Sequence, residues 1–296
     1  MTTQHQENLP APAIGIIGGS GLYDLEGLED RKEYTVDTPW GPPSDEITGG
    51  KLAGRQVYFL PRHGRGHRIL PGELNHRANL WALRSLDVRW VICVTATGSL
   101  KEEYAPRDIV LPDQFFDRTS RRSEHTFFGK GIVAHVGFSD PVSAGLRSIL
   151  HEVCRDQQRR VHDGGTYVNM DGPAFSTRAE SQANRQLGFD VIGMTNLPEA
   201  KLAREAEMAL ATLAMITDYD CWKVDEEPVN AQTVIGHLHA NAAAAREIIA
   251  AAIPRIPLIA DWPEHRALDM ALVTRPELWP GDTVENLKPI LRRFLA

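Results

Sequence analysis

The sequence predicts an α/β fold in which a central sheet is flanked by helices. Six short apolar runs bounded by turn residues have the length and composition of buried strands. Helical patterns lie between several of these runs, and such alternation is typical of α/β proteins. The chain has 296 residues, of which 42% are hydrophobic, which suffices for the core of one large domain. The expected strands are residues 14–17, 57–60, 91–94, 109–111, 191–194 and 210–216.

Residues 75–85, 197–210 and 230–253 carry the helical patterns. Pro198 suits a first helical position, where its missing N–H costs nothing. The third segment should end before Pro254, because the residue that precedes a proline disfavours the helical conformation. Helices should therefore separate and follow the predicted strands.

The chain is expected to divide into three parts. Residues 1–12 lack the basic start and apolar run of a signal peptide, so they are interpreted as a disordered tail. Residues 13–254 hold every predicted strand and form the domain. Residues 255–296 are rich in proline and end in a helix-like stretch at 284–295. We expect this C-terminal extension to pack on the domain.

Composition excludes several classes of function. The net charge is -7, with 32 Lys and Arg against 39 Asp and Glu, so no basic surface for nucleic acid is expected. No run approaches the roughly 20 apolar residues of a membrane span. Cys93, Cys154 and Cys221 are odd in number and lack C-x-x-C spacing, which fits neither a disulfide framework nor a thiolate zinc site. A cytoplasmic protein is expected.

A glycine-rich turn follows the first predicted strand, in the string G-I-I-G-G-S-G-L-Y-D of residues 15–24. Glycines and the small Ser20 would let backbone N–H groups approach an anion closely. A dinucleotide fingerprint would need a third glycine where Asp24 stands, which disfavours an NAD site. A tight turn without a ligand remains an alternative.

A cationic loop, R-H-G-R-G-H-R, follows the second of these strands at residues 62–68. Arg62 offers a planar fork of donors suited to phosphate, and His63 adds a donor beside it. A solvated basic loop is the alternative. His63 and His67 have the spacing of a helical metal pair, but the intervening glycines disfavour a helix, so no metal site is expected.

Hydroxyl side chains follow two further strands, at Thr95 and Thr195. In open α/β sheets, ligands bind outside the carboxyl ends of the strands. One threonine at a strand end is usually structural, but Ser20, Arg62 with His63, Thr95 and Thr195 share one chemistry. The sequence therefore predicts one oxyanion pocket.

Two carboxylates, Asp218 and Asp220, follow the last strand at positions i and i+2. If the strand continued, both would point to one face. Carboxylates so close repel, and in a dry site one can take up a proton, which suits a group that protonates a leaving base. A solvated turn or a helix N-cap at Asp220 is the alternative.

Several strings occur in order between residues 14 and 253 and together resemble the methylthioadenosine phosphorylase family of trimeric nucleoside phosphorylases. They are I-G-I-I-G-G-S-G, D-T-P-W-G-P-P-S-D, R-H-G-R-G-H, T-A-T-G-S-L, M-D-G-P-A-F-S-T-R-A-E-S, G-M-T-N-L-P-E-A and T-D-Y-D-C-W. The resemblance implies a single-domain nucleoside-phosphorylase fold with a mixed sheet. It implies phosphorolysis of S-methyl-5'-thioadenosine to adenine and 5-methylthioribose 1-phosphate, without metal or organic cofactor, by a homotrimer or hexamer.

The resemblance also assigns site residues. It implies that phosphate is bound by Ser20, Arg62, His63, Thr95, Ala96 and Thr195. It implies a nucleoside site in which Met194 lies beneath the ribose, Phe175 packs against the purine and Asp218 and Asp220 face the base, Asp218 serving the ring nitrogen that becomes protonated. Further substrate contacts are implied for Ser176, for Ala231, Val234 and Ile235 around the methylthio group, and for His135, which would enter a neighbouring subunit's site.

Other functions stay open at this point. A purine nucleoside phosphorylase acting on 6-oxopurines would share the fold, but two aspartates favour a base that carries an amine. A hydrolytic nucleosidase would act without phosphate, and a nucleoside sensor would show no turnover. Ala231 stands where a larger aliphatic residue is common in the family, which would widen the 5' slot.

Overall fold

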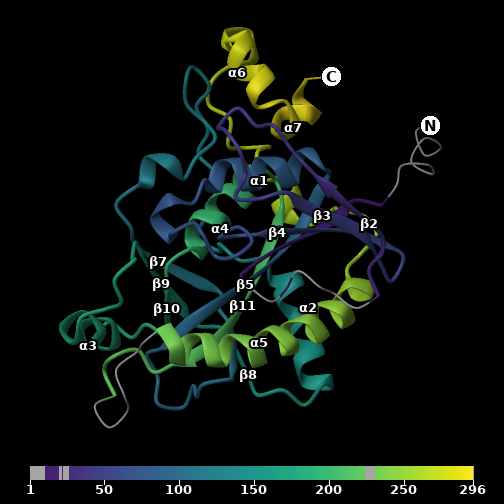
Figure 1. Ribbon diagram of the computed structural model, residues 1–296. Coiled ribbons are helices and arrows are strands. Elements are labelled where there is room, and N and C mark those ends of the chain that lie inside the picture. The colour runs from purple at the N-terminus through teal and green to yellow at the C-terminus, as the bar shows by residue number, and fades with distance from the viewer. Residues whose placement is uncertain (1–10, 20–21, 23–26, 224–230, 296) are drawn as a thin grey trace.

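The computed structural model describes residues 11–19, 22, 27–223 and 231–295, without the side chains of 231–239. Its described strands form one mixed sheet of eleven strands, with helices against both faces (Figure 1). The predicted α/β class with a mixed, helix-flanked sheet is confirmed. No helix within the described ranges is long and apolar enough to cross a membrane.

The strands begin and end close to the predicted runs, and five more strands join them. The bounds are β1 Ala13–Gly18, β2 Glu29–Tyr34, β3 Ile47–Leu52, β4 Arg55–Pro61, β5 Val88–Ser99, β6 Ile109–Leu111, β7 Gln114–Arg118, β8 Val161–Asp163, β9 Thr166–Met170, β10 Val191–Gly193 and β11 Ala209–Asp218. Strands β2, β3, β7, β8 and β9 were not predicted. Strand β2, of sequence EDRKEY, is almost entirely exposed and so carries no apolar pattern.

The α-helices are α1 His76–Ser85, α2 Ala144–Asp156, α3 Arg178–Gln186, α4 Asn196–Glu205, α5 Ala231–Ala252, α6 Gly281–Asn286 and α7 Lys288–Leu291. Short 3-10 turns lie at Pro71–Glu73, Arg122–Glu124, Ile253–Arg255, Pro263–Arg266, Pro276–Leu278 and Arg292–Phe294. Helices α1, α4 and α5 lie where they were predicted. Helices α2 and α3 were not predicted.

Two predicted helical segments differ from the structure. The segment 197–210 stops being helical at Glu205, because the chain turns through a left-handed residue, Glu207 (φ 55°), to enter β11. The segment 284–295 forms α6, α7 and a 3-10 turn instead of one helix. Pro289 lies in the first turn of α7, since a proline can begin a helix but interrupts the hydrogen bonds of a helix interior.

The sheet order β2-β3-β4-β1-β5-β10-β9-β7 puts β1 and β5 at the centre, and β11 pairs along the other edge of β5, from Trp90 to Gly98. Pairing is parallel between β1, β4, β5 and β11 and antiparallel between β5 and β10. Every residue of β1 is buried, as its continuous apolar sequence requires.

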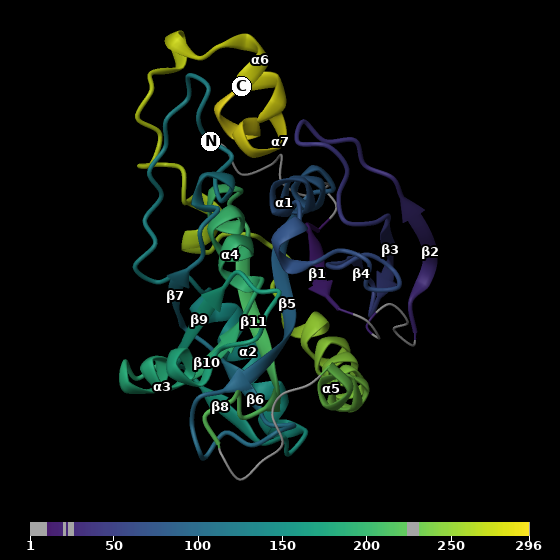
Figure 2. The same cartoon turned by 60° about the vertical axis from the view of Figure 1, so that its left-hand side comes forward.

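Two apolar cores cover the faces of the sheet. On one face, Ile16 of β1 packs in a cluster with Leu150 of α2 and Ile248 of α5. On the other, Ile17 belongs to a cluster with Leu83 of α1 and with residues of α4. Figure 2 shows α5 on one side of the central strands and α1 and α4 on the other. The sheet is thus buried on both faces, with its carboxyl edges left for a ligand.

The C-terminal extension lies over the second face of the sheet. Ile290 and Leu291 of α7 are buried in the same cluster as α1, and α6 and α7 lie above α1 in Figure 2. Trp81 of α1 donates from Nε1 to the carbonyl of Asn286 at 2.8 Å. Arg293 binds Glu207, which is fully buried, through Nε at 2.8 Å and Nη2 at 2.5 Å. Apolar packing and an ion pair between an exposed arginine and a buried carboxylate therefore hold the extension in place.

Candidate active site

A cavity of about 490 Å³ opens at the carboxyl ends of β1, β4, β10 and β11. Its size is that of a typical small-molecule site, and its walls are mainly apolar with a few polar groups. Segments from both ends of the chain reach it, from Gly19 after β1 to Ala242 of α5. The carboxyl edge of the sheet therefore carries the candidate site.

The cavity exists because β5 changes neighbours along its length. On one edge β5 pairs with β1 as far as Cys93, and β10 joins that edge only at Gly98. Between these points, residues 94–97 line the cavity. The prediction that Thr95 follows the end of a strand is therefore wrong, since β5 continues to Ser99. Thr95 reaches the cavity because its neighbouring strand ends, not its own.

Arg62 lies in the cavity wall and is 2% exposed. Its guanidinium forms a bidentate pair with Glu199, from Nε at 2.5 Å and from Nη2 at 2.9 Å. Burial opposes the charge on both groups, but their pairing outweighs it, so the pKa of Arg62 is raised and that of Glu199 is lowered. The pair is ionised, and its net charge is zero.

His63 adjoins Arg62 and also lines the cavity. Its Nδ1 lies 2.9 Å from the carbonyl oxygen of Ile69, and its ring stacks on that of His67 at 4.3 Å between centroids. Burial and then the charge of Arg62 lower the pKa of His63 to about 4. The ring is therefore neutral at pH 7, and with Nδ1 donating to Ile69 it presents Nε2 as an acceptor. The prediction that His63 adds a donor is therefore wrong, because the carbonyl of Ile69 takes its only N–H.

Thr195 stands at the N-cap of α4 and lines the cavity, as do Thr95 and Ala96. Its hydroxyl makes no capping hydrogen bond. The N-terminus of this ten-residue helix offers the positive end of its dipole. Few of its N–H groups are free, because Leu197 donates to Asn169 Oδ1 at 3.1 Å and Pro198 has no N–H. Thr95 Oγ1 lies 3.5 Å from the buried hydroxyl of Tyr167, which supports it from behind. An anion would be well accommodated on this side of the cavity.

Asp218 and Asp220 line the opposite part of the cavity. The condition for a shared strand face is not met, because β11 ends at Asp218 and Asp220 adopts a left-handed turn (φ 53°). The turn closes on itself, since the Asp220 N–H donates to Asp218 Oδ1 at 2.8 Å. Asp218 Oδ2 accepts from the hydroxyl of Thr217 at 2.7 Å.

The two carboxylates differ in environment. Asp220 is 9% exposed, and its Oδ2 is buried without a hydrogen-bond partner among the described residues. Burial raises the pKa of Asp220. A buried oxygen without a partner is costly in the unliganded protein. The alternative of a solvated turn is thereby disfavoured.

Three other predicted residues also meet in the cavity: Met194 after β10, and Phe175 and Ser176 from the loop before α3. Phe175 is half exposed, at 48%, and forms part of the rim. Asn241 of α5 was not predicted, although it lines the cavity and its Nδ2 donates to the carbonyl of Ile216 at 3.1 Å. This bond ties α5 to the end of β11.

The remaining predicted residues are not placed at the cavity. Ser20 lies outside the described residues, as do the side chains of Ala231, Val234 and Ile235. His135 is exposed and is not among the residues that line its own chain's cavity. It lies on an extended segment whose N–H donates to the carbonyl of Ala271 in the C-terminal extension.

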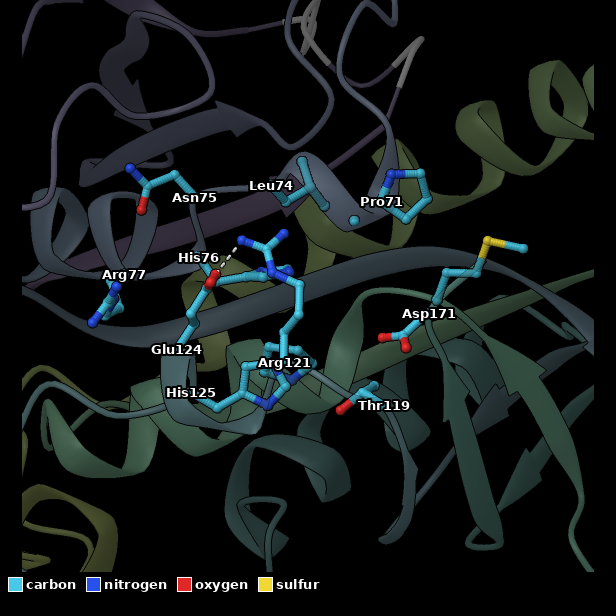
Figure 3. A pocket seen from close by; sticks show the side chains of 13 residues that line it. Pro71, Leu74, Asn75, His76, Arg77, Thr119, Arg121, Glu124, His125 and Asp171 are labelled. Atoms are coloured by element: carbon cyan, nitrogen blue, oxygen red, sulfur yellow. Dashed lines mark hydrogen bonds and ion pairs between the residues drawn. The ribbon is translucent and has the colours of Figure 1, made fainter. Parts of the chain in front are cut away.

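A second, much smaller pocket of about 30 Å³ adjoins the cavity and shares Pro71 and Met194 with it (Figure 3). Figure 3 shows the Arg121 side chain crossing this pocket to its ion-pair partner Glu124. Its volume suits about two water molecules. A nucleoside does not fit there. A third pocket, of about 340 Å³, lies between residues 37–39 and the C-terminal extension and contains no predicted site residue, so the largest of the three is the candidate active site.

Glu199 is the main site residue that sequence reasoning missed. It lies in the string M-T-N-L-P-E-A, three residues after Asn196, and was interpreted only as part of a helix. The available signal was that Glu199 lies four residues after Thr195, a predicted phosphate ligand. Its ion-pair partner Arg62 lies 137 positions away in the sequence, so only the fold shows that the two residues meet.

The fold and the site define the class of this protein: the chain belongs to the Phosphorylase superfamily, whose model matches residues 13–254. Within this class it belongs to the S-methyl-5'-thioadenosine phosphorylase family. The relative of that name from Gloeobacter violaceus is 51% identical over 292 residues, which cover 97% of each chain. The one from Geobacter sulfurreducens is 49% identical over 95% of this chain and 99% of its own.

Solved structures agree with this assignment. A methylthioadenosine phosphorylase from an antarctic soil metagenomic library superposes with a TM-score of 0.90 at 45% identity, covering 96% of this chain and all of its own. Methylthioadenosine phosphorylase from Schistosoma mansoni, in complex with adenine, gives a TM-score of 0.82 at 35% identity, covering 90% of this chain and all of its own.

Proposed function

We propose that this chain cleaves S-methyl-5'-thioadenosine with inorganic phosphate, releasing adenine and 5-methylthioribose 1-phosphate. The observation that carries the proposal is a single cavity with anion-binding groups on one side and two carboxylates on the other. The chain that holds this cavity shares about half of its residues, over nearly its full length, with S-methyl-5'-thioadenosine phosphorylases.

Phosphate is assigned to the side of Arg62, His63, Thr95, Ala96 and Thr195, with Ser20 of the glycine-rich sequence. His63 would accept through Nε2 from the protonated oxygen of hydrogen phosphate. As the glycosidic bond lengthens, the sugar gains oxocarbenium character and positive charge. A phosphate anion held beneath the anomeric carbon stabilises that charge and then forms the new C–O bond. Met194 is assigned to the ribose, between the phosphate and the base.

Adenine is assigned to the side of Asp218 and Asp220, with Phe175 packing against the ring and Ser176 beside it. The carboxylates accept from the exocyclic amine, and Asp218 serves the ring nitrogen that is protonated as the base leaves. A 6-oxopurine would present a carbonyl to the same oxygens, with lone pairs facing lone pairs. The pair therefore favours adenine over hypoxanthine and guanine.

The 5' methylthio group is assigned to Ala231, Val234 and Ile235 on α5 and to His135 of a neighbouring copy in a homotrimer or hexamer. Support for the assembly comes from an exposed apolar patch around His135. Val133 is 43% exposed and Val273 62% exposed, and the N–H of Val273 donates to the carbonyl of Val133 at 2.8 Å. A second copy would cover this patch.

Catalysis on this scheme needs no metal or organic cofactor, since phosphate is a co-substrate and the residues above supply the remaining chemistry. Activity should therefore survive EDTA. We also propose a cytoplasmic location, where Cys93, Cys154 and Cys221, all free in the structure, would stay reduced.

The test is adenine release from S-methyl-5'-thioadenosine with and without phosphate. Phosphorolysis requires that release depend on phosphate and yield a sugar 1-phosphate. Equal rates in phosphate-free buffer would identify a hydrolase instead. Inosine cleaved as readily as S-methyl-5'-thioadenosine would favour a 6-oxopurine phosphorylase.

A further inference from the structure

The guanidinium of Arg62 is almost fully engaged by the protein. Besides its two bonds to Glu199, it donates from Nη1 to the carbonyl of Val94 at 2.8 Å and from Nη2 to that of Ile17 at 3.5 Å. A guanidinium has five N–H bonds. These contacts use four of them and leave one Nη1 N–H without a partner among the described residues.

Glu199 sets this geometry from inside the wall. It is 1% exposed and cannot touch a ligand in the cavity, whose lining does not include it. Its two oxygens take the Nε and Nη2 bonds in a fork-to-fork arrangement, which fixes the plane of the guanidinium. With that plane fixed, the remaining N–H of Nη1 keeps one direction.

Glu199 also connects Arg62 to the helix that carries Thr195. It lies in the first turn of α4, and its Oε2 accepts from Asn196 Nδ2 at 3.2 Å. Asn196 Oδ1 in turn accepts from the buried hydroxyl of Thr212 on β11 at 2.6 Å. One buried carboxylate therefore links the loop after β4, the N-terminus of α4 and the central sheet.

We propose that Glu199 is a positioning residue for the phosphate subsite: it orients Arg62 toward phosphate and holds Arg62 and Thr195 in register. This inference rests on the proposed function, since it assigns phosphate to that side of the cavity. Because Glu199 also cancels the charge of Arg62, phosphate is bound by oriented N–H and O–H donors more than by net positive charge.

The test is Glu199→Gln, measured for kcat and for the KM of each substrate. The amide keeps the volume but turns NH₂ against one guanidinium N–H, which breaks the fork. Losing one charge-assisted hydrogen bond should raise the KM for phosphate by about 10- to 100-fold. The KM for S-methyl-5'-thioadenosine at saturating phosphate should stay within about twofold of the unmodified protein.

Glu207→Gln is the matched control, because Glu207 is a second buried carboxylate in a bidentate pair with an arginine, Arg293, and lies outside the cavity lining. It should lower thermal stability without moving the KM for phosphate. If Glu199→Gln does not fold, Asn196→Thr removes the 3.2 Å bond to Glu199 together with the 2.6 Å bond from Thr212. Thr212→Val removes the second bond alone and is its control, so the KM for phosphate should rise about two- to fivefold more in Asn196→Thr than in Thr212→Val.

The outcomes separate the two proposals. A phosphate KM within twofold of the unmodified protein, or an equal rise in both KM values, would overturn the positioning role while phosphorolysis stood. Adenine release by the unmodified protein without phosphate would instead overturn the proposed function.

Discussion

The Asp220 carboxylate should lower the stability of the unliganded protein, although the reaction requires it. Asp220→Asn measures this loss of stability. Asp220 Oδ2 is buried and has no hydrogen-bond partner among the described residues. An uncharged atom left in this way costs about 1–3 kcal/mol and a charged one costs more, so removing the charge should recover about 1–3 kcal/mol. The amide has the same shape without the charge. Asparagine also tolerates the left-handed backbone of this position (φ 53°), so the substitution adds no strain.

The sign of the effect follows from the pKa. Burial raises the pKa of Asp220 in the folded protein above its ordinary value of 3.8. The folded state therefore favours the protonated carboxyl. That contribution to stability is complete below pH 3.8 and is lost as the pH rises through the folded pKa. Asp220→Asn should match the unmodified protein near pH 4 and be more stable at pH 7.5.

The assay is thermal unfolding at the two pH values, beside kcat/KM for S-methyl-5'-thioadenosine. A gain of about 1–3 kcal/mol corresponds to a Tm about 2–6 °C higher at pH 7.5, while kcat/KM should fall at least about 100-fold. Asp218→Asn is the control, because both Asp218 oxygens already accept protein hydrogen bonds and no stability should be gained. A Tm for Asp220→Asn that is unchanged or lower at pH 7.5 would show that the buried Asp220 carboxylate does not destabilise the folded protein.

Three further predictions concern base selection, packing and the chain end. Asp218→Asn with Asp220→Asn should shift the preference from S-methyl-5'-thioadenosine toward methylthioinosine by about 100-fold or more, since amides can donate to a carbonyl; an unchanged ratio of kcat/KM values would contradict it. Gly98→Ala would place a Cβ 3.1 Å from Asp218 Oδ1, so kcat/KM should fall about tenfold, and a rate equal to that of the unmodified protein would count against this contact. Arg293→Ala leaves the buried Glu207 without its cation and should lower stability by about 2–3 kcal/mol in thermal unfolding, whereas substitution of the exposed Arg292 by alanine should not. Equal effects of the two substitutions would show that the Arg293–Glu207 ion pair does not hold the C-terminal extension in place.

Strands with continuous apolar runs could be predicted from the sequence, because a strand that is buried on both faces is apolar at every position, whichever strands it pairs with. Ile14–Ile17 and Leu210–Ile216 are of this kind, and both lie at the centre of the sheet. Chemistry likewise identified the candidate site residues: the glycines, arginine and threonines on the anion side of the cavity, and the two aspartates on the other side. Strand β2 could not, because an exposed edge strand carries no apolar period.

Tertiary structure alone decided how those residues act. Thr95 reaches the cavity because β1 ends beside it, and Asp220 turns back onto Asp218, neither of which a local pattern encodes. Glu199 meets Arg62 across 137 positions. The orientation and the pKa of a site side chain depend on which groups lie within a few ångströms of it. Folding brings those groups together from distant parts of the chain, so a local sequence pattern does not contain them.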